Sequence, residues 1–257
     1  MDAIVVAGGI PGPEDPLYPL TQGRPKALLE LEGRPMLQWV VDALEASARV
    51  EHVVAIGPGP EFGLRFGPKT TCLPDQGGMI ANILFGLKTV QRLSPGATHT
   101  LLASGDIPAI TPEMVDWRVA TVEAAGADID YAVVERQTMD RVFPGSRRSF
   151  TWLKEAEVCG GDLNGVSMSA ACDEPLWNAL VASRKNALKQ AALIGYDVLL
   201  LALFRQLTLR DAERRVSRNL GLKAHVTLSP YAEVGMDVDK PHQLELVRQY
   251  LRARGAA

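Results

Sequence analysis

Paired glycines and two cations near the start of the chain are the first residues that could bind a ligand. Residues 4–7 form a short apolar run, typical of a parallel strand that is buried on both faces. Gly8 and Gly9 follow at once, and glycines there let the backbone turn sharply and present its N–H groups to an anion. The loop beyond them ends in Arg24 and Lys26. Taken alone, this segment is explained equally well by a phosphate-binding loop and by an ordinary strand-to-turn connection.

Asp106 is the next candidate, because it follows another apolar strand. Residues 98–103 form that strand, and residues 104–108 continue as Ser-Gly-Asp-Ile-Pro. An acidic residue just past the carboxyl end of a central strand lies where open α/β sheets bind their ligands. Thr111 and Pro112 then supply an N-cap and a first helical residue. Asp106 therefore either serves a ligand site or caps the turn between strand and helix.

Two amide side chains stand in a third loop. Gln76 and Asn82 belong to a glycine-containing segment, residues 75–82, which opens a helix with apolar residues at helical spacing. Each amide donates and accepts hydrogen bonds, so either one suits a base edge or a ribose. The structural alternative is that Asn82 only serves the start of the helix. The four histidines are scattered and show no triad or metal-ligand spacing.

Composition and charge narrow the class of protein. The chain has 257 residues, of which 47% are hydrophobic and 22% charged, as in an ordinary soluble globular protein. A net charge of -3 does not favour a nucleic-acid partner. The longest apolar run, residues 198–204, is far shorter than a membrane span, and no signal peptide is recognisable. Three distant cysteines indicate reduced thiols. We therefore expect a cytoplasmic protein without a membrane partner.

Alternating strand and helix patterns predict the fold class. Apolar strands alternate with amphipathic helices, which indicates an α/β protein with a mostly parallel central sheet and helices on both faces. We expect one domain over residues 1–257, in which residues 136–195 form an insertion or lid that builds the acceptor side of the cleft. The expected strands are residues 4–7, 53–56, 70–73, 98–103, 129–134, 150–154, 224–228 and 232–234, and the later expected helices are residues 174–194, 209–219 and one from 241 onward.

The opening of the chain resembles a known family. Residues 19–37 contain Pro-Leu-Thr, Arg-Pro-Lys-Ala-Leu-Leu-Glu and Gly-Arg-Pro-Met-Leu, and this pattern is similar to the opening of the GT-A-like nucleotidyltransferases, the NTP transferase or MobA-like family. The resemblance implies a GT-A-like, Rossmann-type nucleotide-binding fold. It also implies that an NTP is held by the loop of Ala7, Gly8 and Gly9 and by Lys26. The family usually places Ser or Thr and then Arg after the paired glycines, which this chain lacks. Either Arg24 replaces that arginine, or triphosphate binding is weaker.

Two later segments carry the same resemblance. Gly-Asp-x-Pro at residues 105–108 matches a family hallmark whose Asp holds the divalent metal that bridges the NTP phosphates. Residues 235–244 resemble a third hallmark, an acidic or amide residue followed by Thr-Pro-x-x-Leu. Asp239 aligns best with the second metal ligand and Asp237 assists, although Asp239 could equally cap the final helix, or do both. The resemblance thus implies Mg²⁺, or Mn²⁺ in its place, held by Asp106 and Asp239.

The resemblance extends to the substrates. In the family the region corresponding to residues 75–82 often lines the nucleotide base, which implies that Gln76 and Asn82 bind the nucleotide. Some members carry a Gly-Gly-Asn segment where this chain has Gly-Gly-Asp-Leu-Asn, so Asp162 and Asn164 are candidates for binding the acceptor.

A reaction follows from the same resemblance. An NMP would pass from an NTP to a phosphorylated small molecule of the sugar phosphate, polyol phosphate or molybdopterin type, and pyrophosphate would leave. Lys26, Asp106 and Asp239 would be the catalytic residues. Because an acceptor phosphate is already anionic near neutral pH, no general base is needed, which fits the lack of an obvious catalytic histidine.

Two other classes remain open. A GT-A glycosyltransferase would use the same nucleotide-binding half on a nucleotide-sugar, and Asp-Val-Asp at residues 237–239 has the form of its metal motif. A non-catalytic nucleotide-binding sensor stays open because of the missing arginine and of acidic Glu14 and Asp15 in the first loop. A dinucleotide-binding dehydrogenase fits poorly, because residues 8–12 do not read Gly-x-Gly-x-x-Gly. The base, the acceptor and the oligomeric state are left open by the sequence.

Overall fold

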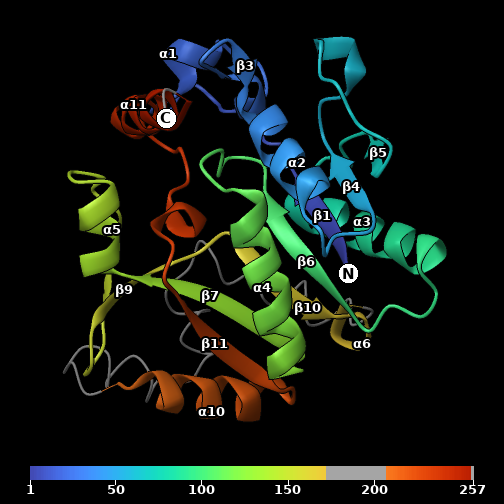
Figure 1. Cartoon of the computed structure of the whole chain (residues 1–257), viewed down its shortest axis with the longest axis vertical. Coiled ribbons are helices and arrows are strands. Elements are labelled where there is room, and N and C mark those ends of the chain that lie inside the picture. The colour runs from blue at the N-terminus through green and yellow to red at the C-terminus, as the bar shows by residue number, and fades with distance from the viewer. Residues whose placement is uncertain (172–206, 256–257) are drawn as a thin grey trace.

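The computed structural model describes residues 1–171 and 207–255, and one large sheet organises them (Figure 1). Within those residues the sheet has nine strands. Eight follow the order β5 (Thr70–Leu73), β4 (Val53–Ile56), β1 (Asp2–Val6), β6 (His99–Ser104), β10 (Leu163–Ser167), β7 (Ile129–Glu135), β9 (Glu157–Gly160) and β8 (Thr151–Trp152). The ninth, β11 (Ala224–Ser229), pairs with β7. A separate hairpin joins β2 (Glu30–Leu31) and β3 (Arg34–Pro35).

Short and long helices complete the described elements. They are α1 (Tyr18–Thr21), η1 (Lys26–Leu28), α2 (Met36–Ala46), η2 (Pro60–Phe62), α3 (Met79–Leu93), α4 (Pro112–Ala125), α5 (Arg136–Val142), α6 (Met168–Ala171), α10 (Leu209–Leu220), η3 (Ala232–Gly235) and α11 (Pro241–Gly255). The expected cap of α4 is confirmed, because the Thr111 side chain accepts a hydrogen bond from the Met114 N–H. No helix in the described ranges is both long enough and apolar enough to cross a membrane.

Strand directions confirm the expected mostly parallel sheet. β1 is parallel to β4 and β6, β4 is parallel to β5, and β7 is parallel to β11. β10 is antiparallel to both β6 and β7, and β9 is antiparallel to β7 and β8. Because β10 reverses direction between them, β6 and β7 run the same way. The carboxyl ends of the parallel strands therefore meet at one edge of the sheet, where α/β proteins bind ligands.

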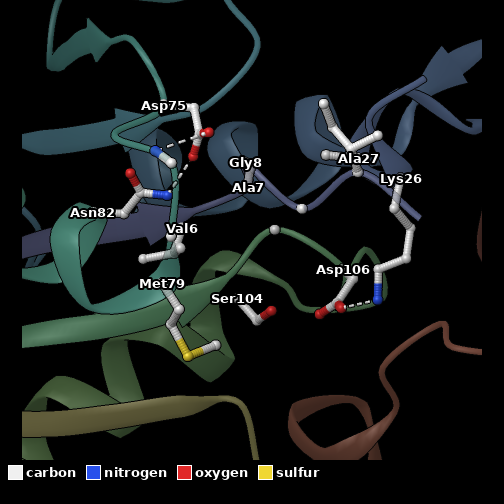
Figure 2. A pocket seen from close by; sticks show the side chains of 15 residues that line it. Val6, Ala7, Gly8, Lys26, Ala27, Asp75, Met79, Asn82, Ser104 and Asp106 are labelled. Atoms are coloured by element: carbon white, nitrogen blue, oxygen red, sulfur yellow. Dashed lines mark hydrogen bonds and ion pairs between the residues drawn. The ribbon is translucent and has the colours of Figure 1, made fainter. Parts of the chain in front are cut away.

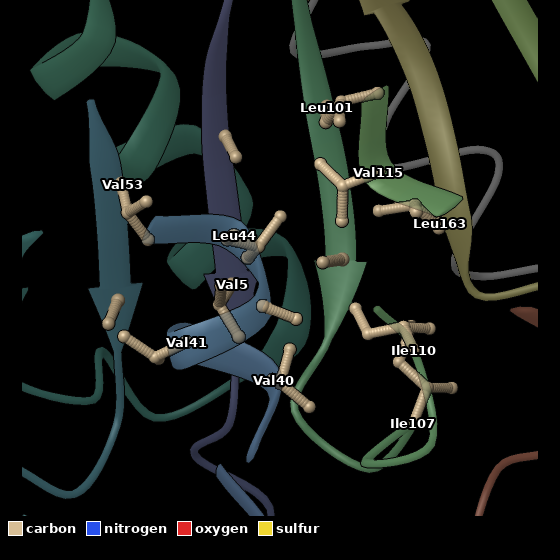
Figure 3. Packing of buried hydrophobic residues seen from close by; sticks show 14 of the residues in the cluster. Val5, Val40, Val41, Leu44, Val53, Leu101, Ile107, Ile110, Val115 and Leu163 are labelled. Atoms are coloured by element: carbon tan, nitrogen blue, oxygen red, sulfur yellow. The ribbon is translucent and has the colours of Figure 1, made fainter. Parts of the chain in front are cut away.

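Helices cover both faces, as the alternation predicted. Successive residues of a strand point to opposite faces, so Val5 packs in the core beneath α2 and α4, and Ile4 packs in the core beneath α3. Figure 3 shows the first of these cores, where Val5 lies among Val40, Leu44 and Val115 from the two helices. This packing anchors the start of the chain in the middle of the sheet.

The final helix closes a further core beside the first helices. Leu244 and Val247 of α11 pack with Leu17, Leu31 and Met139, and Figure 1 shows α11 next to α1. The loop that precedes α11 is thereby brought to the carboxyl edge of the sheet. Residues more than two hundred positions apart in the sequence meet there.

One expected strand is wrong. Residues 232–234 belong to the 3-10 helix η3, in which Ala232, Glu233 and Val234 are all buried. A strand would turn alternate residues to opposite faces, whereas this single turn presses consecutive residues into the core. A run of three mostly apolar residues does not distinguish the two structures by its periodicity.

The range expected as an insertion or lid is only partly described. Up to residue 171 it contains α5, β8, β9, β10 and α6, and β10 lies inside the main sheet between β6 and β7. This part therefore builds the sheet itself. The expected helix at residues 174–194 and the apolar run at 198–204 lie outside the described residues, and the lid stays a prediction. Cys72 and Cys159 are free thiols, and Cys172 lies outside the described residues.

Candidate functional site

A cleft of about 470 Å³ opens at the carboxyl ends of β1 and β6. Most of its lining residues belong to the turns at residues 6–10, 77–78 and 104–106. Its chemically active side chains are those of Lys26, Asp75, Asn82 and Asp106, and Figure 2 shows them around the cleft. The cleft thus combines three turns, two of them rich in glycine, with one cation and two carboxylates.

Close packing explains the glycine at the end of β1. A Cβ added to Gly8 would lie 1.9 Å from Oδ1 of Asp75, so no larger residue fits unless that carboxylate moves. Gly9 has open space around its Cα, and its carbonyl accepts a hydrogen bond from the Lys26 N–H at 3.0 Å. Gly8, Gly9 and Lys26 therefore line the same cleft, together with Ala7.

Lys26 joins the two carboxylates that the sequence singled out. Its Nζ lies 2.5 Å from Oδ2 of Asp106 and 2.7 Å from Oδ1 of Asp239. The Lys26 and Asp106 side chains are 19% and 14% exposed, whereas that of Asp239 is 53% exposed. Burial lowers the pKa of the Lys26 ammonium, but the attraction of Asp106 and Asp239 outweighs it and raises that pKa above its usual range. Lys26 is therefore a firmly charged cation.

Lys26 contacts only one of the two carboxylate oxygens of Asp106, Oδ2. The other oxygen, Oδ1, is buried and has no hydrogen-bond partner in the part of the chain that the structure describes. A buried carboxylate oxygen without a donor is costly, because desolvation is not repaid. Such an oxygen is suited to a cation, and Asp239 stands across Lys26 from it.

Backbone hydrogen bonds hold the two acidic segments together. The Val238 N–H donates to the Asp106 carbonyl at 3.0 Å, and the Asp239 N–H donates to Oε1 of Gln243 at 2.9 Å. Through the second bond, a side chain in the first turn of α11 holds the backbone just before the helix. Asp239 is thus fixed at the helix start by its backbone, while its carboxylate contacts Lys26.

Arg148 supports the same segment from the other side. Its guanidinium forms an ion pair with Asp237, two residues before Asp239, and donates to the Gly160 carbonyl. The neighbouring Ser146 carbonyl accepts from Nε2 of Gln243. Arg148 thus braces the loop that carries Asp239.

Asp75 is a site residue that sequence reasoning missed. It follows β5 as Asp106 follows β6, so an acidic residue just past a strand end was the available signal. Its Oδ1 accepts from Nδ2 of Asn82 at 2.7 Å, and its Oδ2 accepts from the Gly77 N–H at 3.1 Å. Asn82 in turn accepts from the Gln76 N–H at 2.7 Å. Asn82 is buried and Asp75 is exposed, and both line the cleft. Nucleotide binding by Asn82 stays a prediction.

Two residues expected at the nucleotide do not line the cleft. Arg24 and Gln76 are both exposed and are absent from its lining. The Gln76 side chain donates to the Pro74 carbonyl instead. Nucleotide binding by Gln76, and by Arg24 in place of the missing family arginine, stays a prediction.

The two acceptor candidates lie where β9 passes into β10. Asn164 uses its amide inside this bend, accepting from the Ala132 N–H and donating to the Gly161 carbonyl. The Asp162 carbonyl accepts from the N–H of Ser104, which lines the cleft. Asp162 is thus placed beside the cleft, and acceptor binding by either residue stays a prediction.

A second acidic cluster lies elsewhere. Asp2, Glu51 and His52 have ligand atoms within 4.8 Å of one another. They stand at the amino ends of β1 and β4, at the opposite edge of the sheet from the cleft. This cluster therefore takes no part in the site of Lys26 and Asp106.

Comparison with known proteins agrees with the geometry. A family model described as the MobA-like NTP transferase domain matches residues 20–224. A molybdenum cofactor guanylyltransferase of Rhizobium meliloti (strain 1021) is 33% identical over 133 residues, which cover 51% of this chain and 56% of that protein. The chain thus spans about half the length of this curated relative.

Solved structures extend the likeness over the whole chain. A hypothetical transferase from Thermus thermophilus superposes with a TM-score of 0.81 at 34% identity and covers 95% of this chain and 100% of its own. A 2-C-methyl-D-erythritol 4-phosphate cytidylyltransferase, also from Thermus thermophilus, gives a TM-score of 0.53 at 15% identity, covering 98% and 100%. The second likeness shows the fold alone.

Proposed function

Because the chain belongs to the MobA-like NTP transferase family, we propose that it transfers an NMP from an NTP to a phosphorylated small molecule and releases pyrophosphate. The observation that carries this proposal is the meeting of Lys26, Asp106 and Asp239 at the mouth of a glycine-lined cleft. One cation and two carboxylates beside a glycine turn are the parts that phosphoryl transfer needs, since its catalysis rests on positioning and charge.

The triphosphate occupies the turn at the end of β1. Backbone N–H groups of Gly8 and Gly9 supply fixed donors there, and Lys26 supplies a mobile point charge. This arrangement favours the substrate with the highest phosphate charge, as expected for an NTP. Arg24 remains outside the cleft, so the loop relies on Lys26 for its side-chain cation.

Guanine is the base that best fits the loop of Asp75. A carboxylate only accepts hydrogen bonds. Oδ1 of Asp75 accepts one from Asn82 and Oδ2 accepts one from Gly77, and each oxygen can accept a further bond. Guanine places two adjacent donors, N1–H and the N2 amino group, on its Watson–Crick edge. The guanylyltransferase from Rhizobium meliloti is consistent with this choice.

The donor set at the cleft also fits a divalent cation. Asp106 and Asp239 converge on one point, and Oδ1 of Asp106 is buried without a partner in the described residues. Hard carboxylate oxygens suit Mg²⁺, and Mn²⁺ is an acceptable substitute. Bound there, the metal would neutralise charge on the phosphates as the reaction proceeds.

The chain's own residues perform the remaining work. An anionic phosphate oxygen of the acceptor forms a bond to the α-phosphorus, the bond to the β-phosphate oxygen breaks, and pyrophosphate leaves with that electron pair. Lys26 donates to the phosphate oxygens on which charge accumulates. No side chain needs to remove a proton, because the nucleophile is already ionised. The acceptor is of the sugar phosphate, polyol phosphate or molybdopterin type.

Pyrophosphate release tests the proposal. Each of the four NTPs is incubated with the protein, Mg²⁺ and a panel of phosphorylated acceptors, and pyrophosphate is measured with and without acceptor. We expect acceptor-dependent release with GTP above the other NTPs. Nucleotide binding without release for any acceptor would favour the sensor alternative, and turnover of a nucleotide-sugar would favour the glycosyltransferase.

A further inference from the structure

We propose that Lys26 serves as the built-in counter-cation of the Asp106–Asp239 pair and opposes the binding of free metal, so that a divalent ion is held tightly only once the phosphates of a nucleotide attract Lys26 away. This inference rests on the proposed function, because it assigns the same two carboxylates to a metal. It adds an order of events in which the metal enters with the nucleotide rather than ahead of it.

The contacts of Nζ are the first argument. An ammonium that lies 2.5 Å from one carboxylate oxygen and 2.7 Å from the other fills the space between them. Mg²⁺ binds carboxylate oxygens at about 2.1 Å, so an ion that touched both of these oxygens would overlap Nζ. The ammonium and the metal therefore compete for one position.

Charge balance is the second argument. Asp106 and Asp239 carry two negative charges, and Lys26 already neutralises one of them. A dication placed on the remaining oxygens, such as the buried Oδ1 of Asp106, would still lie a few ångströms from the ammonium and be repelled by it. Because Lys26 and Asp106 are mostly buried, water screens that repulsion only in part.

The reach of Lys26 is the third argument. Its backbone is tied to the glycine turn by the hydrogen bond from its N–H to the Gly9 carbonyl. Its flexible side chain lines the same cleft as Gly8 and Gly9. Rotation about side-chain bonds is therefore enough to carry the ammonium from the carboxylates toward phosphates at the turn, without movement of the backbone.

Mn²⁺ binding without nucleotide isolates this competition from catalysis. Mn²⁺ is titrated into the wild-type chain and into Lys26→Met, and free Mn²⁺ is followed by its electron paramagnetic resonance signal. We expect Lys26→Met to bind Mn²⁺ ~10-fold or more tightly than the wild type, a modest share of what removing an adjacent unit charge can give in a partly exposed site. Lys26→Gln repeats the test, should Met at this position impair folding.

Two matched variants identify the source of the effect. Arg65→Met removes one exposed cation whose backbone, not its side chain, makes the hydrogen bonds to Gln38. It should leave Mn²⁺ affinity at the wild-type value, which excludes a simple effect of net charge. Adding Asp106→Asn to Lys26→Met should abolish the gain, which places the ion on this carboxylate.

The outcomes separate this inference from the proposed function. Equal Mn²⁺ affinity in the wild type and both Lys26 variants, or a gain that survives Asp106→Asn, would overturn the role of Lys26, even in a chain that releases pyrophosphate normally. A gain that depends on Asp106, in a chain that releases no pyrophosphate with any NTP and acceptor, would support the competition and remove the transferase function.

Discussion

Among the residues that the structure describes, Arg118 is the largest fully buried side chain, and its removal tests the fold. It and Asp130 are both 0% exposed, with Nη1 of Arg118 lying 3.1 Å from Oδ2 of Asp130. Nε donates to the Leu163 carbonyl and Nη2 donates to the Asp130 carbonyl. One guanidinium therefore joins α4 to β10 and β7, the two strands that extend the sheet beyond β6.

The expected cost of Arg118→Met follows from these contacts. The substitution keeps an unbranched side chain in the core but leaves the Asp130 carboxylate buried, with Thr227 as its remaining donor among the residues described. Breaking a buried pair from one side typically costs about 3–5 kcal/mol, because an uncompensated charge is left behind. For a chain of this size such a loss lowers Tm by roughly 6–20 °C.

Thermal and urea unfolding measure this loss, with Arg49→Met as the matched control. Arg49 pairs with Glu123, which lies on α4 as Arg118 does, but both side chains of this pair are about half exposed. We therefore expect Arg49→Met to change the free energy of unfolding by about 1 kcal/mol or less. Changing Asp130→Val in the Arg118→Met background should recover part of the stability. If Arg118→Met is no more destabilising than Arg49→Met, the buried pair does not join these elements as described.

Three further predictions concern the site and the final helix. Lys26→Ala should lower kcat for pyrophosphate release by ~10²-fold or more. Lys26→Arg should not restore kcat fully, because a planar guanidinium does not reproduce a compact ammonium. Unchanged turnover in both variants would remove Lys26 from the mechanism. Asp75→Asn should lower kcat/KM for GTP relative to the other NTPs by ~10-fold or more, because one of the two accepting oxygens becomes a donating NH₂ group. An unaltered ratio of kcat/KM values would contradict recognition of guanine by Asp75. Burial and the hydrogen bond to Glu233 raise the pKa of Tyr250 to about 12 from 10.0. The raised pKa stabilises the folded protein fully below pH 10, and this stabilisation is lost as the pH rises toward 12. In urea unfolding, Tyr250→Phe should therefore lose less stability than the wild type between pH 10 and pH 12.

Local patterns in the sequence were sufficient for the order of most elements and for part of the site. Strands β4 and β5 were predicted with their observed bounds. For β4 the reason is that a buried apolar run between turn residues has one good solution inside an α/β sheet. Gly8, Lys26 and Asp106 were expected near one ligand and line one cleft. Each lies at or next to a strand end or turn whose position the local pattern already specifies.

Only the tertiary structure decided how the remaining residues meet. Asp239 reaches Lys26 across 213 positions of sequence because α11 packs beside the first helices. Asp75 lines the cleft, whereas Arg24 and Gln76 are exposed and absent from its lining, although all three stand in loops. Side-chain direction in a loop depends on which hydrogen bonds and cores hold its backbone, and those partners come from distant parts of the chain, where sequence spacing carries no information.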